Sequence, residues 1–132
     1  MSTRTLGTAG ENEAALYLMK RGYEILARNL YIGHLEIDIL AKDDTHLCFV
    51  EVKARHQHPD NRDYGRPADR VDAQKKARLK AAVRSFRKTH PFEYGDLIPN
   101  IDIIEVYLDP ADPKGTRVLD NRHFKNAVNG MR

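Results

Sequence analysis

Charged residues recur inside two otherwise apolar segments near the middle of the chain. Asp38 lies within "EIDIL" at 36–40, and Glu51 and Lys53 lie within "FVEVKAR" at 49–55. A charge inside an apolar strand is costly unless it is paired or binds a metal. Carboxylates beside a lysine suit Mg²⁺ or Mn²⁺, because hard cations prefer oxygen ligands. A bound divalent ion activates water and stabilises charge on a phosphoryl oxygen, so the combination indicates metal-dependent phosphodiester hydrolysis.

The elements that must position these residues can be predicted from hydrophobic periodicity. It predicts a helix, three strands, a second helix and a fourth strand. These elements cover residues 8–21, 23–31, 35–41, 46–54, 69–89 and 101–108. Three meandering strands followed by a helical crossover predict an α/β protein with a mixed sheet flanked by helices.

The whole chain, residues 1–132, is expected to form one domain. The tail at about 110–132 is expected to pack on the core as an extension. It contains a turn at 112–115, a short strand at 116–119 and a last helical turn at 124–128.

Pairing the second and third strands about a turn at 43–44 decides which faces the charges take. This register puts Asp38 opposite Phe49, with Glu51 a diagonal neighbour of Asp38 at roughly 7–8 Å. Asp38, Glu51 and Lys53 then share one face, because strand side chains alternate. Sliding the register by two residues preserves that face, whereas a one-residue bulge would break it.

Each helix adds one charge to its buried side. Glu11 follows the apolar stripe of the first helix, and Lys75 is in line with the buried face of the second. We therefore expect Glu11, Asp38, Glu51, Lys53 and Lys75 to meet at one polar site. The alternatives are simple charge complementarity at a helix N-terminus for Glu11 and a snorkelling side chain for Lys75.

The second helix and the loop before it are strongly basic. Asp69 and Asp72 are the only acids in this helix, so its cations are poorly balanced by ion pairs. We expect contact with a DNA phosphate backbone, and the alternative is a solvated helix face. The residues expected to bind nucleic acid are Arg55, Arg66, Arg70, Lys75, Lys76 and Arg78.

The motifs taken together point to a family. Asp38 followed by Glu51-Val52-Lys53 resembles the D…(D/E)xK signature of the restriction-endonuclease-like superfamily. A wider set resembles the uncharacterised bacterial YraN-like family, which is related to archaeal Holliday junction resolvases. This set comprises Gly10-Glu11, "RGYEILARN" at 21–29, "EIDIL", "FVEVKAR", "YG" at 64–65, Val71 with Lys75, "IDII" at 101–104 and "NAV" at 126–128.

The resemblance implies a restriction-endonuclease-like αβββαβ core and a nuclease site. It implies that Asp38, Glu51 and the backbone carbonyl of Val52 bind Mg²⁺ or Mn²⁺, that Glu11 adds a further acid, and that Lys53 assists the attacking water. It also implies a DNA substrate, branched or damaged, and a homodimer of the kind that related resolvases form. The chain departs from the family at Leu35, where the family usually has glycine, and at "NAV" in place of "NAF".

Bulk properties restrict the alternatives. The single cysteine excludes an internal disulfide and suits a cytoplasmic location. The net charge of +3 suits an anionic partner. No segment is apolar for long enough to span a membrane. Besides a nuclease, two interpretations stay open: a nucleic-acid-binding module without turnover, and an interaction protein whose acids form structural ion pairs.

Overall fold

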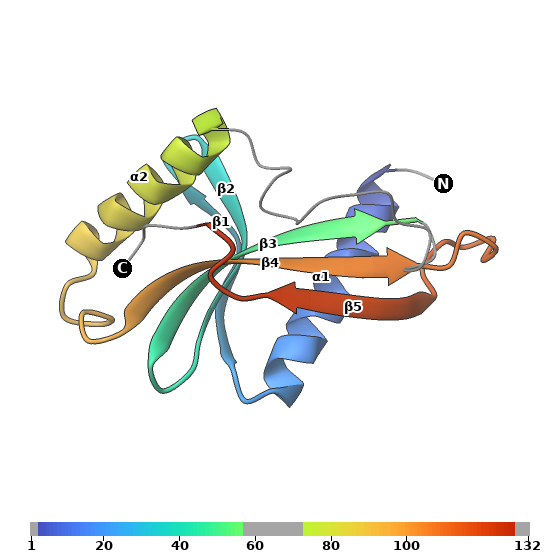
Figure 1. The fold of residues 1–132 in the computed structure, drawn as a ribbon, viewed down its shortest axis with the longest axis horizontal. Coiled ribbons are helices and arrows are strands. Elements are labelled where there is room, and N and C mark those ends of the chain that lie inside the picture. Colours follow the sequence, from blue (N-terminus) through green and yellow to red (C-terminus); the bar gives the residue numbers. More distant parts are fainter. Residues whose placement is uncertain (1–2, 57–72, 129–132) are drawn as a thin grey trace.

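The computed structural model describes residues 3–56 and 73–128, with side chains from residue 8 onward (Figure 1). Arg66 and Arg70, which we expect to bind nucleic acid, lie outside the described residues. The described elements are α1 (Thr3–Lys20), β1 (Glu24–Ile32), β2 (Leu35–Lys42), β3 (His46–Arg55), α2 (Ala73–Thr89), β4 (Ile98–Leu108) and β5 (Val118–Phe124).

One mixed sheet organises the chain. Its strand order is β1-β2-β3-β4-β5, and β3 and β4 are parallel while the other neighbours are antiparallel. Antiparallel strands can be joined by tight turns, but β3 and β4 need a crossover, and α2 lies in that crossover. The predicted αβββαβ order and α/β class are therefore confirmed.

The two helices cover opposite faces of the sheet (Figure 1). On the α1 side, Leu18 packs with Val50 of β3 in one apolar cluster. On the α2 side, Leu79 and Phe86 pack with Phe49 of β3 in the other. β4 runs between these clusters and is buried at every residue after Ile98, as expected of a strand covered on both faces.

The register between β2 and β3 differs by two residues from the predicted one. Leu40 pairs with Phe49, and Lys42 with Leu47. The cause lies in the turn, where the Asp43 carboxylate accepts the N–H groups of Thr45 and His46 at 2.9 and 2.7 Å. This local bonding by Asp43 lengthens the loop, as aspartate turns do. Because the shift is even, the charged residues keep the predicted face.

The tail departs further from prediction. β5 continues to Phe124, and the helical turn predicted at 124–128 is absent from these described residues. Instead, Asp102 holds this segment: its Oδ1 accepts the N–H of Asn126 and its Oδ2 lies 2.8 Å from Nε2 of His123. Both side chains of the Asp102–His123 pair are almost fully buried. Because the buried Asp102 carboxylate accepts the N–H of Asn126, this N–H does not form the backbone hydrogen bond that a helical turn would need.

Candidate functional site

The site begins where β2 and β3 separate. Their described pairing ends at Ile39 and Val50, and the next residues on the two strands are Asp38 and Glu51. Asp38 Oδ2 accepts the N–H of Val52 at 2.8 Å, so a side chain replaces the missing strand partner. The N–H and C=O of one strand residue point to the same side, so the Val52 carbonyl faces the same gap.

The two oxygens of Glu51 have different surroundings. Lys75 Nζ donates to Oε1, and Lys53 Nζ lies 3.7 Å from the same atom. Oε2 is buried and has no hydrogen-bond partner. A buried oxygen without a partner is costly, and a cation is one ligand that would satisfy it.

A small cavity lies among these groups. It measures about 10 Å³ and is lined by Asp38, Glu51 and Lys75, with Glu36 at its margin. This volume is on the scale of one water molecule. The described residues hold no preformed group of three or more His, Cys, Asp or Glu side chains around a metal position. A metal here would therefore be held by two carboxylates, a backbone carbonyl and water, which suits Mg²⁺ because it retains several waters.

Glu11 reaches this region from the opposite face of the sheet. Gly10 permits the approach of α1, since a Cβ at Gly10 would lie 3.0 Å from the Cβ of Ala54 on β3. Glu11 Oε1 lies 3.8 Å from Arg28 of β1, and Arg28 also donates to Asn12 at 2.9 Å. Burial raises the pKa of Glu11, Arg28 opposes the rise, and the charge of Glu36 adds to it.

Asp38 shows the strongest electrostatic effect of the site. Burial is the largest cause that raises its pKa to about 6, and the charges of Glu11, Glu51 and Glu36 add to the rise. The Val52 N–H opposes it, because it donates to the ionised form. The charges of the three other carboxylates thus act on Asp38, and a bound cation would lower the pKa of Asp38.

The structure brings together most of the residues that the sequence predicts for the site. Asp38, Glu51 and Lys75 line one cavity, and Lys53 lies close to Glu51. Glu11 lies near enough for its charge to raise the pKa of Asp38.

Two partners of this site were not predicted. Arg28 pairs with Glu11, and Glu105 of β4 lies 3.7 Å from Arg55. Glu105 is buried, and Tyr107 donates to it at 2.6 Å. Parallel pairing places Glu105 opposite Lys53, which a prediction of the β3–β4 register would have found.

The other predicted contacts of α2 lie apart from the carboxylates. Arg78 lines a cavity of about 470 Å³ with residues 32–35 of the β1–β2 turn. Lys76 is half-buried on the same helix. In the described part of the chain, no salt bridge joins either residue to Asp38 or Glu51.

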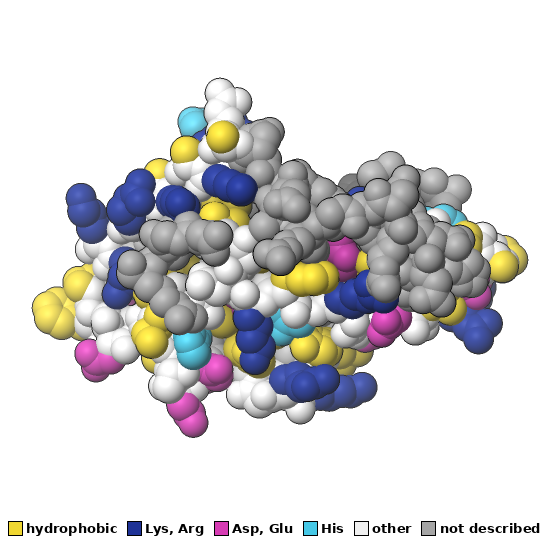
Figure 2. Space-filling model, viewed as in Figure 1, with side chains coloured by type: hydrophobic (Ala, Val, Ile, Leu, Met, Phe, Trp, Pro, Cys, Tyr) yellow, Lys and Arg dark blue, Asp and Glu magenta, His cyan; other side chains and the backbone are white. Residues whose placement is uncertain are grey.

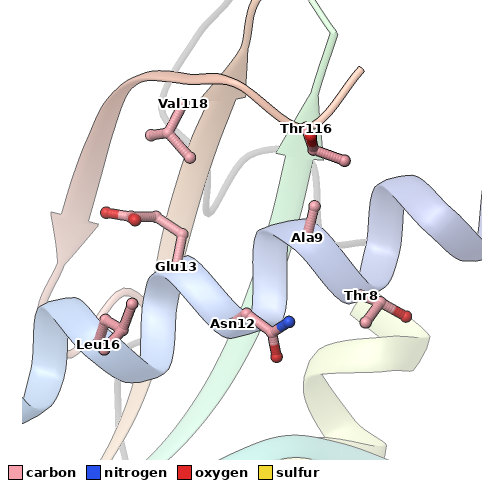
Figure 3. Close-up of a pocket in the computed structure, with 7 residues that line it drawn as sticks. All are labelled: Thr8, Ala9, Asn12, Glu13, Leu16, Thr116 and Val118. Carbon is pink, nitrogen blue, oxygen red and sulfur yellow. The ribbon is translucent and has the colours of Figure 1, made fainter. Parts of the chain in front are cut away.

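A larger hollow lies elsewhere, between α1 and the segment that leads into β5 (Figure 3). It measures about 590 Å³ and includes one carboxylate, Glu13, which accepts a hydrogen bond from Asn121 at 2.9 Å. It contains none of the clustered acids, so size alone does not make it the candidate site. Within the described ranges, neither helix has the length and apolar character to cross a membrane.

Fold and site thus define an α/β protein of αβββαβ order with a charged gap between two strands of its sheet. The chain belongs to the Uncharacterised protein family UPF0102, whose profile matches residues 10–106. This confirms the resemblance to the YraN-like family.

Relatives in the same family cover most of the chain. A UPF0102 protein of Chloroherpeton thalassium is 39% identical over 105 residues, which are 80% of this chain and 77% of that one. A UPF0102 protein of Carboxydothermus hydrogenoformans is 37% identical over 126 residues, 96% and 93% of the two chains. Among solved structures, Pyrococcus furiosus SfsA in complex with Ca²⁺ matches with a TM-score of 0.39 at 14% identity, covering 93% of this chain and 64% of that one. That likeness is too distant to support an argument about function.

Proposed function

We propose that the chain is a Mg²⁺- or Mn²⁺-dependent DNA endonuclease that hydrolyses phosphodiester bonds. The observation that carries this proposal is the buried Oε2 of Glu51, which has no partner although Glu51 lines a cavity with Asp38. Structural ion pairs alone would not explain a buried carboxylate oxygen without a partner at this place.

The donor set fits a hard divalent ion. Asp38, Glu51 and the carbonyl of Val52 would hold it, and it would supply an activated water and charge stabilisation at the scissile phosphate. Lys53 lies on the same strand face as Glu51, from which its ammonium can orient the attacking water or offset charge on the phosphoryl oxygens. Lys75 neutralises one oxygen of Glu51 and fixes its position. Glu11, positioned by Arg28, adds negative charge next to Asp38.

The surface beside the site suits a polyanion. α2 carries seven Lys and Arg residues and no acid between Ala73 and Thr89. Figure 2 shows a row of Lys and Arg side chains along this helix. Phosphate contacts of this kind bind DNA without reading its sequence, so the proposal predicts strong salt dependence.

Cleavage of labelled DNA tests the proposal. Duplex, single-stranded, flap and four-way-junction DNA are incubated with Mg²⁺, Mn²⁺ or EDTA, using wild type and the Glu51→Ala and Lys53→Ala variants. Asp44→Ala is the control, because Asp44 is an exposed acid in the turn between the same strands. Metal-dependent cleavage that both site variants lose and the control keeps supports the nuclease.

The opposite result favours the second function. If wild type and Glu51→Ala bind DNA equally and neither cuts any substrate, the nuclease proposal is wrong. The basic surface of α2 would then support a nucleic-acid-binding module on the same fold.

A further inference from the structure

A turn after α2 holds a phenylalanine in solvent. Phe92 is 98% exposed, the largest exposure among the large apolar residues described. A side chain of this type normally gains stability from burial. Pro91 and Glu93 beside it are exposed too, whereas His90 and Tyr94 are half-buried. The conformation of the turn therefore places the Phe92 side chain in solvent.

The turn is firmly supported from below. His90 stacks on Phe86 of α2 with ring centroids 4.1 Å apart, and Tyr94 stacks on the same ring at 6.0 Å. Phe86 is itself buried in the core. A Cβ at Gly95 would lie 2.3 Å from the Pro91 carbonyl oxygen, so the turn closes as tightly as glycine permits. Phe92 is thus presented on a fixed support.

Positive charge lies next to this turn. Arg84, Arg87 and Lys88 line a cavity of about 380 Å³ together with Pro91 and Tyr94. None of these three cations forms a salt bridge with any described residue. All three cations lie in the C-terminal part of α2, just before the turn.

Charges are segregated at this corner. The turn itself carries the exposed acids Glu93 and Asp96, which repel phosphate, whereas the cations lie on the helix side. A ligand that fits both sides has an anionic part for the helix and a neutral, flat part for Phe92. A nucleotide has this division between its phosphate and its base.

We propose that Phe92 with Arg84, Arg87 and Lys88 forms a second DNA contact, which takes an unpaired nucleotide. Phe92 stacks on the base, and the three cations hold the adjacent phosphates. The base must be unpaired, because a base inside a duplex has no free face for an aromatic side chain. This inference rests on the proposed function, and it narrows the substrate to DNA with a single-stranded end, flap or branch.

The geometry of α2 sets the spacing. Thirteen residues separate Lys75 at the carboxylates from Lys88 at the turn, which is about 20 Å along a helix. At about 3.4 Å per nucleotide, this corresponds to about six nucleotides. Cleavage is therefore expected on the order of six nucleotides from the position where the strand becomes unpaired.

Equilibrium binding in EDTA tests the second contact without cleavage. The probes are a blunt duplex and the same duplex with a short overhang that contains 2-aminopurine, measured by anisotropy and by base fluorescence. The proteins are wild type, Phe92→Ala, Phe92→Tyr and the control Leu16→Ala, which truncates another exposed apolar residue on α1. Stacking by Phe92 predicts about tenfold weaker binding of the overhang DNA by Phe92→Ala, with retained affinity in Phe92→Tyr and Leu16→Ala.

The outcomes separate this inference from the proposed function. If wild type prefers the overhang probe and Phe92→Ala loses both the preference and the quenching of 2-aminopurine, the second contact is supported. If wild type and Phe92→Ala bind both probes alike, the second contact is wrong while DNA binding stands. If wild type binds neither probe, DNA binding itself fails, and the second contact fails with it.

Discussion

Replacing Asp38 by asparagine should stabilise the folded protein at neutral pH. The pKa of Asp38 is raised from 3.8 to about 6, so the folded chain binds this proton more tightly than the unfolded chain. The stability that this group provides is present below pH 3.8 and is lost as the pH rises through about 6. Above pH 6, the ionised carboxylate lies among Glu11, Glu36 and Glu51 and destabilises the fold.

The magnitude follows from the raised pKa. Each pKa unit corresponds to about 1.4 kcal/mol, so the full effect is about 3 kcal/mol. Asp38 is partly exposed, and solvent screening reduces this to about 1–2 kcal/mol. Asparagine keeps an oxygen that can accept the Val52 N–H, so the bond between β2 and β3 is retained.

Urea unfolding followed by circular dichroism measures the effect. In EDTA at pH 7.5, Asp38→Asn should have a free energy of unfolding about 1–2 kcal/mol above wild type, and at pH 4 the difference should nearly vanish. Mg²⁺ should narrow the gap at pH 7.5 by stabilising wild type alone. Asp44→Asn, in the exposed turn, serves as control. An Asp38→Asn variant that is less stable than wild type at pH 7.5, or a stability difference that does not change with pH, would contradict this prediction.

Two further substitutions test packing. Gly10→Val should lower the free energy of unfolding, measured in urea, by about 1–3 kcal/mol, because the valine side chain meets Ala54 and pushes α1 away from β3. Unchanged stability would show that α1 has room to move. Asp102→Ala should cost about 3–5 kcal/mol, because it leaves buried His123 and the Asn126 N–H without their partner. A loss below 1 kcal/mol, no greater than that of exposed Asp120→Ala, would mean that the Asp102–His123 pair contributes little.

The sequence predicts the sheet face on which the charged side chains lie better than it predicts the residues that they contact. Side chains on β2 and β3 alternate with period two, so Asp38 and Glu51 keep their common face when the register shifts by two residues. The shift itself depends on the side-chain bonds of Asp43, which strand periodicity does not contain. The αβββαβ order could also be predicted, because long segments with apolar periodicity define its helices and strands.

Partners from other elements were harder to find. Arg28 lies on β1 beyond an irregularity between Ile25 and Ala27, and this irregularity changes which side chains face α1. Glu105 lies inside an apolar strand, where its neighbours suggest only core packing. The predicted helical turn at 124–128 failed because Asp102, more than twenty residues earlier, binds that backbone.

The end of the β2–β3 ladder has a consequence for spectroscopy. The Val52 amide proton is held by a carboxylate and not by a strand carbonyl. Its chemical shift and its hydrogen-exchange rate therefore depend on the charge of Asp38, whereas amides in the paired ladder depend on backbone geometry. One resonance in the middle of β3 can thus report protonation of the site, or ligation of a cation there, in a sample that contains no DNA.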